Sequence, residues 1–129
     1  MTDRILVSSG SPNEPKIGFS RAVRVGNIIA VAGTTPMNPD ATVASPGDVY
    51  GQTKRCIEII IKAVEDAGGK ATDIVRTRVF LTDIKTWQDA AKAHGEAFGT
   101  IRPATSFVEC SGLINPEWLV EVEADAVVG

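Results

Sequence analysis

Apolar and acidic residues alternate strictly from residue 120 to residue 126. Successive side chains of a strand point to opposite faces, so this pattern predicts a strand over residues 119–127 with one apolar and one acidic face. Because acidic residues are poor strand formers and neighbouring carboxylates repel each other, we expect the acidic face to meet water, cations or a binding cleft. The apolar positions are Val120, Val122, Ala124 and Ala126, and the acidic positions are Glu121, Glu123 and Asp125.

Other short apolar runs, rich in β-branched residues, also predict strands. Two of them are separated by Gly26-Asn27, a dipeptide that favours a two-residue hairpin turn. These strands are predicted over residues 19–25, 28–33, 74–81 and 105–110, and residues 5–7 allow a further short strand.

Two segments carry apolar residues at helical spacing. The first runs from Asp48, a residue type that caps helices, to Ala67, and Gly68-Gly69 ends it. The second begins at residue 85 or 86 and runs to Phe98. The segments at 8–16 and 34–47 are rich in turn formers and are predicted to be loops.

The alternation of strands and helices predicts one α/β (α+β) domain over residues 1–129. Crossovers between parallel strands are right-handed in nearly all cases, and two crossovers that step the same way place both helices on one face of the sheet. We therefore expect a mixed sheet with two helices on one face and an uncovered second face.

The uncovered face is expected to carry both signs of charge and one aromatic ring. Such a face favours contact between subunits, with arginines and carboxylates paired across strands or subunits; a solvated face is the alternative. We expect Arg76, Arg78, Phe80, Glu121, Glu123 and Asp125 on it, and Val75, Thr77, Val79 and Leu81 on the helix-covered face.

Composition narrows the function classes. The net charge of −3 and the lack of a basic cluster argue against nucleic acid as the main partner. No apolar run is long enough for a membrane span or a signal peptide, so we expect a cytoplasmic protein. Cys56 and Cys110 are expected to be free thiols, and Cys56 lies on an apolar helix face. His94 is the single histidine and has no partners at ligand spacing, so no metal site is predicted.

Four segments of the chain resemble motifs of the Rid family, also called YjgF or L-PSP proteins. The first, IGFSRAVRVGNIIAVAGTTPMNP, is similar to a family stretch that begins GPYSQAV and ends in a PxNP motif. The second is the predicted first helix with the strand after it, and the third is RPATSFVEC. The fourth, LVEVEADAV, resembles the family signature VEIEAIA.

The resemblance implies a chorismate-mutase-like fold and a barrel-shaped homotrimer with ligand sites in the three clefts between subunits. It also implies hydrolytic deamination of reactive enamines and imines to keto acids and ammonia. In such members an arginine holds the substrate carboxylate, and a glutamate near the last strand positions or activates the attacking water.

Most of the family's pocket residues differ in this chain. Glu121 matches the family glutamate, and Gly33 lies beside the implied pocket. Thr105 stands at the arginine position, and the loss of an ionic clamp costs on the order of 30- to 1000-fold in binding. Lys85 and Arg102 are cations that do not sit at the matching position. The other implied pocket residues are Phe19 at a tyrosine position, Ala32 at a serine, Phe107 at a cysteine and Lys85 near an asparagine.

These residues support three hypotheses. The first is a divergent Rid-type hydrolase that acts on small imines or enamines through Glu121, needs no cofactor because water is the nucleophile, and favours uncharged or larger flat substrates. The second is a trimer that binds a small metabolite without turning it over. The third, with less support from an acidic chain, is an RNA-acting, endoribonuclease-like protein. A structural alternative for Glu121 is an ion pair with Arg76 or Arg78.

Overall fold

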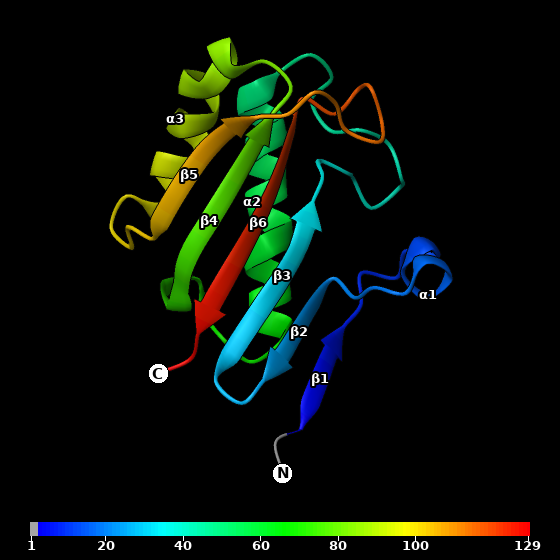
Figure 1. Ribbon diagram of the computed structural model, residues 1–129, viewed down its shortest axis with the longest axis vertical. Helices are drawn as coiled ribbons and strands as arrows, with labels where there is room; N and C mark the ends of the chain where they lie inside the picture. The colour runs from blue at the N-terminus through cyan, green and yellow to red at the C-terminus, as the bar shows by residue number, and fades with distance from the viewer. Residues whose placement is uncertain (1–2) are drawn as a thin grey trace.

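The computed structural model describes residues 3–129 as one six-stranded sheet with two long helices packed on one face (Figure 1). The elements in chain order are β1 (Arg4–Val7), α1 (Asn13–Ile17), β2 (Ala22–Val25), β3 (Ile28–Thr34), α2 (Val49–Asp66), β4 (Ile74–Leu81), α3 (Trp87–Phe98), β5 (Ala104–Glu109) and β6 (Val120–Val127). Short 3-10 turns at Ala71–Asp73 and Ile84–Thr86 precede β4 and α3.

The strand order is β1-β2-β3-β6-β4-β5, so the C-terminal strand lies in the middle of the sheet. The strands β4 and β5 pair in parallel, and every other neighbouring pair is antiparallel. The crossover from β4 to β5 is made by α3, whereas α2 connects β3 to β4 across the intervening β6. The expected mixed sheet with both helices on one face is confirmed (Figure 1).

The core lies between the sheet and the two helices. On β6 the alternation predicted from the sequence is borne out, since its four predicted apolar residues are buried. They pack with residues of α2 such as Ile60 and Cys56, both fully buried, and with Phe98 at the end of α3. No helix of residues 3–129 has both the length and the apolar character needed to cross a membrane.

A β-bulge corrects the face assigned to Val75. The sequence placed Val75 with Thr77 against the helices, but its exposed fraction is 46% and Ile74 is buried instead. The pairing of β4 with β6 shifts between Ile74 and Arg76, and an extra residue in one strand reverses the side chains that precede it. From Arg76 onward the predicted alternation holds.

Two further predictions are wrong in detail at the N-terminal side. The expected loop at 8–16 overlaps the short helix α1, which ends at Gly18 with a left-handed φ of 94°. The amides of Gly18 and Phe19 both donate to the carbonyl of Glu14, so Phe19 belongs to this turn and β2 begins only at Ala22.

The predicted cap of the first long helix is confirmed in position only. At the start of α2, Asp48 occupies the cap position but its side chain makes no capping hydrogen bond.

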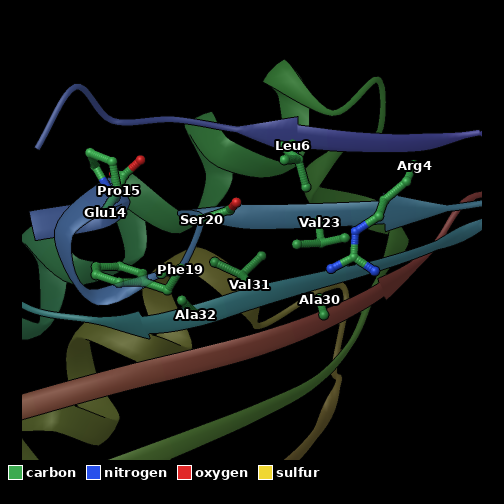
Figure 2. Close-up of a pocket in the computed structure, with 11 residues that line it drawn as sticks. Arg4, Leu6, Glu14, Pro15, Phe19, Ser20, Val23, Ala30, Val31 and Ala32 are labelled. Atoms are coloured by element: carbon green, nitrogen blue, oxygen red, sulfur yellow. The ribbon is translucent and has the colours of Figure 1, made fainter.

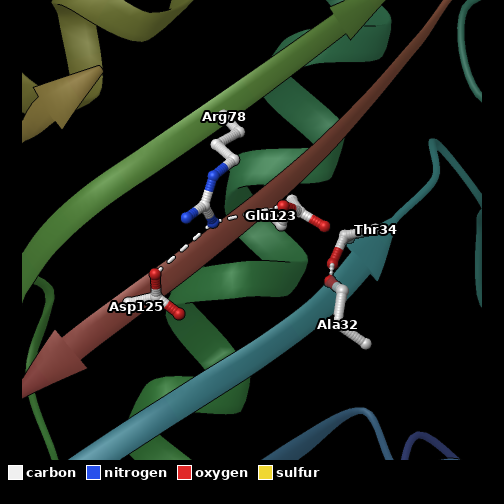
Figure 3. Close-up of polar contacts among 5 residues, drawn as sticks. All are labelled: Ala32, Thr34, Arg78, Glu123 and Asp125. Carbon is white, nitrogen blue, oxygen red and sulfur yellow. Dashed lines mark hydrogen bonds and ion pairs between the residues drawn. The ribbon is translucent and has the colours of Figure 1, made fainter. Parts of the chain in front are cut away.

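The face of the sheet turned away from α2 and α3 carries the predicted charges. Arg78 on β4 reaches over β6 and forms ion pairs with Glu123, at 3.2 Å, and with Asp125, at 3.5 Å (Figure 3). The expected pairing of arginine with carboxylates is therefore confirmed across strands within one chain. These pairs offset part of the repulsion along the acidic ladder.

Candidate functional site

A bulge in β3 includes Gly33, which lies close to the side chain of Glu121. Val31 pairs with Ala124 and Thr34 with Val122, so Ala32 and Gly33 together lie opposite one residue of β6. The hydroxyl of Thr34 donates to the carbonyl of Ala32 at 2.8 Å and closes this bend (Figure 3). A Cβ placed on Gly33 would lie 3.1 Å from Cδ of Glu121 and closer still to its Oε1. Only glycine at this position therefore leaves room for the carboxylate.

The carboxyl of Glu121 is half-buried and forms no ion pair within residues 3–129. The alternative of a direct pair with Arg76 or Arg78 is not formed, because Arg78 turns to the other two acidic residues of the ladder. Burial raises the pKa of Glu121 above its usual value, against the opposing charge of Arg21 and with a further increase from Glu123.

Arg21 is a charged residue of this cluster that sequence reasoning missed. Its Nη2 donates to the carbonyl of Gly33 at 2.5 Å, and its guanidinium lies 5.9 Å from the ring centre of Phe19. In the first family-like segment Arg21 stands where the motif GPYSQAV has glutamine. That exchange, a cation directly before β2, was the available signal, but nothing in the sequence indicated that its side chain would reach β3.

Next to this cluster the uncovered face of the sheet holds a pocket of about 540 Å³ between β1, β2, β3 and α1 (Figure 2). Phe19 and Ala32, two of the predicted pocket residues, line it together with Glu14 and Pro15 of α1. Arg4 and Leu6 of β1, Val23 of β2 and Ala30 of β3 line the rest. The lining is mostly apolar, and its charged groups lie at its two ends (Figure 2).

The remaining predicted site residues lie away from Glu121 in the single chain. Thr105 and Phe107 are on β5, which is separated from β6 by β4, and both point toward α3 rather than toward the uncovered face. Lys85 is in the 3-10 turn next to β5. Arg102, the other cation considered at sequence level, precedes β5 with a left-handed φ of 58°. The chain thus brings Phe19, Ala32, Gly33 and Glu121 together and leaves the β5 group apart.

Thr105 takes part in a chain of hydrogen bonds. Its hydroxyl lies 3.0 Å from the carbonyl of Pro103 and 2.7 Å from the hydroxyl of Thr77, which lies 2.8 Å from Nε2 of His94. Since the Thr105 proton goes to the carbonyl, the Thr77 proton must go to Thr105, and His94 must then donate through Nε2. Burial lowers the pKa of His94, which favours the neutral ring. Within residues 3–129 no group of His, Cys, Asp and Glu could hold a metal ion.

Comparisons with known proteins place this fold and sequence in one family. The profile described as endoribonuclease L-PSP matches residues 11–128. An uncharacterised protein of Streptomyces coelicolor is 37% identical over 95% of this chain and 91% of its own length. A RutC family protein of Pyrococcus abyssi is 36% identical over 98% of both chains.

Solved structures agree with these relatives. A crystal structure of a YjgF/YER057c/UK114 family member from Mycobacterium tuberculosis is 46% identical, with a TM-score of 0.88, over 98% of this chain and 100% of that one. The YjgF gene product of Escherichia coli is 30% identical, with a TM-score of 0.79, over 95% of this chain and 92% of that one. The chain therefore belongs to the Rid family, the group of proteins also named YjgF and L-PSP.

Proposed function

We propose that the protein is a hydrolytic deaminase of small imines and enamines and that Glu121 is its catalytic residue. One observation carries this proposal. The half-buried carboxyl of Glu121, with a raised pKa, lies against Gly33, and the residue before Gly33, Ala32, lines an apolar pocket. Burial raises the pKa of this carboxyl and makes its anion a stronger base than a solvated carboxylate, and imine hydrolysis requires a group that can take up and return a proton.

The proposed reaction converts an imine and water into a carbonyl compound and ammonia. The Glu121 carboxylate accepts a proton from water while the water oxygen forms a bond to the imine carbon and the C=N π pair moves to nitrogen. The proton that Glu121 holds then passes to nitrogen, and the carboxylate next carries the proton of the new hydroxyl to the same nitrogen. The C–N bond breaks, and ammonia leaves as the hydroxyl oxygen becomes a carbonyl. An enamine enters the same path after protonation on carbon. The balance needs neither a redox partner nor a metal ion.

The proposed working site is a cleft between subunits of a homotrimer. Support comes from the separation of the predicted residues into two groups, one at Glu121 and one on β5. A neighbouring subunit that presents its β5 group, Lys85, Thr105 and Phe107, to the Glu121 cluster would complete the pocket that family resemblance implies. Phe19 and Phe107 would then make this pocket more apolar than the tyrosine and cysteine that the family resemblance implies at these two positions.

Two other activities remain as outcomes of the test. A trimer that binds a metabolite without hydrolysing it would share the pocket but not the chemistry. An endoribonuclease would need a cationic surface for phosphates, whereas the net charge is −3 and the single histidine is engaged with Thr77.

The test measures ammonia and carbonyl product from imines generated in situ by amino-acid and amine oxidases, with semicarbazide present to compete for the imine. We expect the protein to increase the rate of hydrolysis for at least one member of a panel that includes charged and uncharged imines. Its activity should fall as the pH drops through the pKa of Glu121, above the ordinary value of 4.5. No acceleration with any imine would reject the enzyme assignment.

A further inference from the structure

We propose that Arg21 is the anion-binding residue of the Glu121 cluster and that it takes the carboxylate of a substrate. This role compensates for Thr105, at the position where family resemblance leads one to expect an arginine. The assignment rests on the proposed site around Glu121. It names the side chain that selects carboxylate-bearing ligands, and it replaces Lys85 and Arg102 as the candidate cation.

The hydrogen bonding of the Arg21 guanidinium is incomplete. Within residues 3–129 the side chain of Arg21 makes one hydrogen bond, from Nη2 to the carbonyl of Gly33. Its Nε is buried and has no acceptor among the described residues. A guanidinium offers five donors in a planar fork that matches a carboxylate through two parallel hydrogen bonds. Buried polar groups are normally satisfied, so the unpartnered Nε indicates a missing acceptor.

The charge of Arg21 has no direct partner either. Arg21 forms no ion pair within the described part of the chain, although it is largely buried. Burial lowers its pKa, and the nearby carboxylates of Glu14 and Glu121 oppose this effect only from a distance. A buried cation without a direct counter-ion is unfavourable, and a bound carboxylate would supply that counter-ion.

Glu14 does not take this place, because its carboxylate is already occupied. It is 5% exposed and accepts hydrogen bonds from the amide of Ser9, at 3.0 Å, and from the hydroxyl of the same residue. Burial acts to raise the pKa of Glu14, but the hydrogen bonds from Ser9, with smaller contributions from Ser8 and from the charge of Arg21, together hold it below its usual value. The Glu14 carboxylate is thereby held toward Ser9, in the loop before α1, and the free donors of Arg21 are left for a ligand.

The position of the Arg21 guanidinium also suits a substrate carboxylate. The guanidinium is held by Phe19, which lines the pocket, and by Gly33, against which Glu121 packs. A ligand carboxylate on Arg21 would therefore lie within one short molecule's length of the proposed base. This is the arrangement that a 2-imino acid needs, since its carboxylate is attached to the carbon that water attacks.

The test is a binding titration by NMR with two probes of the same shape, pyruvate and its neutral amide. Pyruvate is the keto acid formed from 2-aminoacrylate, whose imine tautomer, 2-iminopropionate, is a small 2-imino acid. We expect pyruvate to bind more tightly than the amide. Arg21→Gln should weaken pyruvate binding by roughly 30-fold or more and leave the amide nearly unchanged, because only the charged clamp is lost.

Two variants separate this role from a structural one. Arg24→Gln removes the same charge from β2 at a residue whose side chain bonds the carbonyls of Gly26 and Ala67, and it should not change pyruvate binding. Arg21→Lys keeps the charge without the planar fork and should weaken pyruvate binding less than Arg21→Gln. If Arg21→Gln does not fold, a selective loss of pyruvate affinity in Arg21→Lys gives the same answer.

A second readout is the pKa of Glu121, followed by NMR of its side-chain carboxyl. The charge of Arg21 holds this pKa down, so Arg21→Gln should raise it further, whereas Arg24→Gln should not. Two charged groups act on the pKa of Glu121, Arg21 and Glu123, and Glu123 is on the same strand. The Cys56 thiol of α2 stays neutral, because burial raises its own pKa.

The assignment is overturned if wild-type protein does not prefer pyruvate to the amide, or if Arg21→Gln weakens both probes equally. These results are independent of turnover. Selective pyruvate binding through Arg21 in a protein that hydrolyses no imine would sustain the anion site and reject the proposed enzyme. If Arg21→Gln changes neither imine hydrolysis nor pyruvate affinity, the proposed enzyme is supported and the anion site at Arg21 is rejected.

Discussion

At the scale of single residues, the site depends on a contact between a glycine and a carboxylate. Glu121 is identifiable from the sequence because it stands at the glutamate position of the family-like signature LVEVEADAV. Its environment is not identifiable in this way. Whether an acidic residue in a strand meets solvent, an arginine or a glycine depends on the neighbouring strand's register, which here is set by the bulge at Ala32 and Gly33. Arg21 was missed for the same reason, since its target is a carbonyl 12 residues away.

Gly33→Ala should displace the Glu121 carboxyl. The added Cβ would lie 3.1 Å from Cδ of Glu121 and closer to Oε1, so the side chain must rotate away. We expect imine hydrolysis to fall by about 100-fold, as for a catalytic group misplaced by about 1 Å. The unfolding free energy should change little, because the group that moves is the end of a flexible, half-buried side chain.

The matched control is Gly95→Ala on the exposed side of α3, where no atom lies within 4 Å of the added Cβ. This variant should keep full activity and gain about 0.5–1 kcal/mol in stability, because alanine is the better helix former. Rates and denaturant unfolding measured side by side check both variants. Full activity in Gly33→Ala would mean that the position of Glu121 does not matter for the reaction.

At the scale of elements, periodicity predicted most of the sheet and both long helices, with β4 correct at both ends. What it could not predict are the two bulges, because an extra residue in a strand leaves no mark on composition. The bulge at Ile74/Arg76 explains the wrong face for Val75, and the bulge in β3 shapes the candidate site. The helix α1 was missed because five residues with a proline carry too little periodicity to distinguish them from a loop.

His94 ties α3 to β4 and β5 through Thr77 and Thr105, and this link should depend on pH. Burial lowers the pKa of the folded ring below 6.5, so the unfolded chain binds the proton more readily. The stabilisation is therefore complete above pH 6.5 and is lost as the pH falls through the folded pKa.

Unfolding by urea at a series of pH values, for wild type and His94→Gln, checks this prediction. Because His94 is the single histidine, the difference between the two curves isolates it. We expect the wild-type advantage in unfolding free energy to shrink between pH 7.5 and pH 5. An advantage that stays constant over that range would show that protonation of His94 is not linked to folding.

At the scale of the whole molecule, one face of the sheet lacks a cover. Beside the ion pairs of Arg78 it exposes apolar side chains on β5 and at the β1 edge, such as Val108 and Leu6. Exposed apolar area of this kind, next to a pocket that lacks half of its predicted residues, is typical of an interface between subunits. The sequence resemblance implies a trimer, and the uncovered face of the sheet is the surface that we expect a trimer to bury.

Val108→Glu should weaken that association. Val108 is 42% exposed and pairs in register with Phe80 on the uncovered face, so a charge there would be buried without a partner in a trimer. We expect wild type at three times the chain mass by light scattering and the variant at lower mass. Ile114→Glu, at a loop residue that is 92% exposed, is the control and should remain trimeric. A monomeric wild type would contradict the proposed cleft.

The central claim, that Glu121 is the base of an imine hydrolase, is tested most directly by comparing Glu121→Gln with Glu123→Gln. Both variants replace a carboxylate with its isosteric amide on the same face of β6, but the Glu123 carboxylate is paired with Arg78, whereas Glu121 has no ion pair among the described residues. The measurement is the rate of ammonia release from the best imine substrate. We predict a loss of about 100-fold or more for Glu121→Gln and a rate near wild type for Glu123→Gln. Equal rates in wild type and Glu121→Gln would contradict the account.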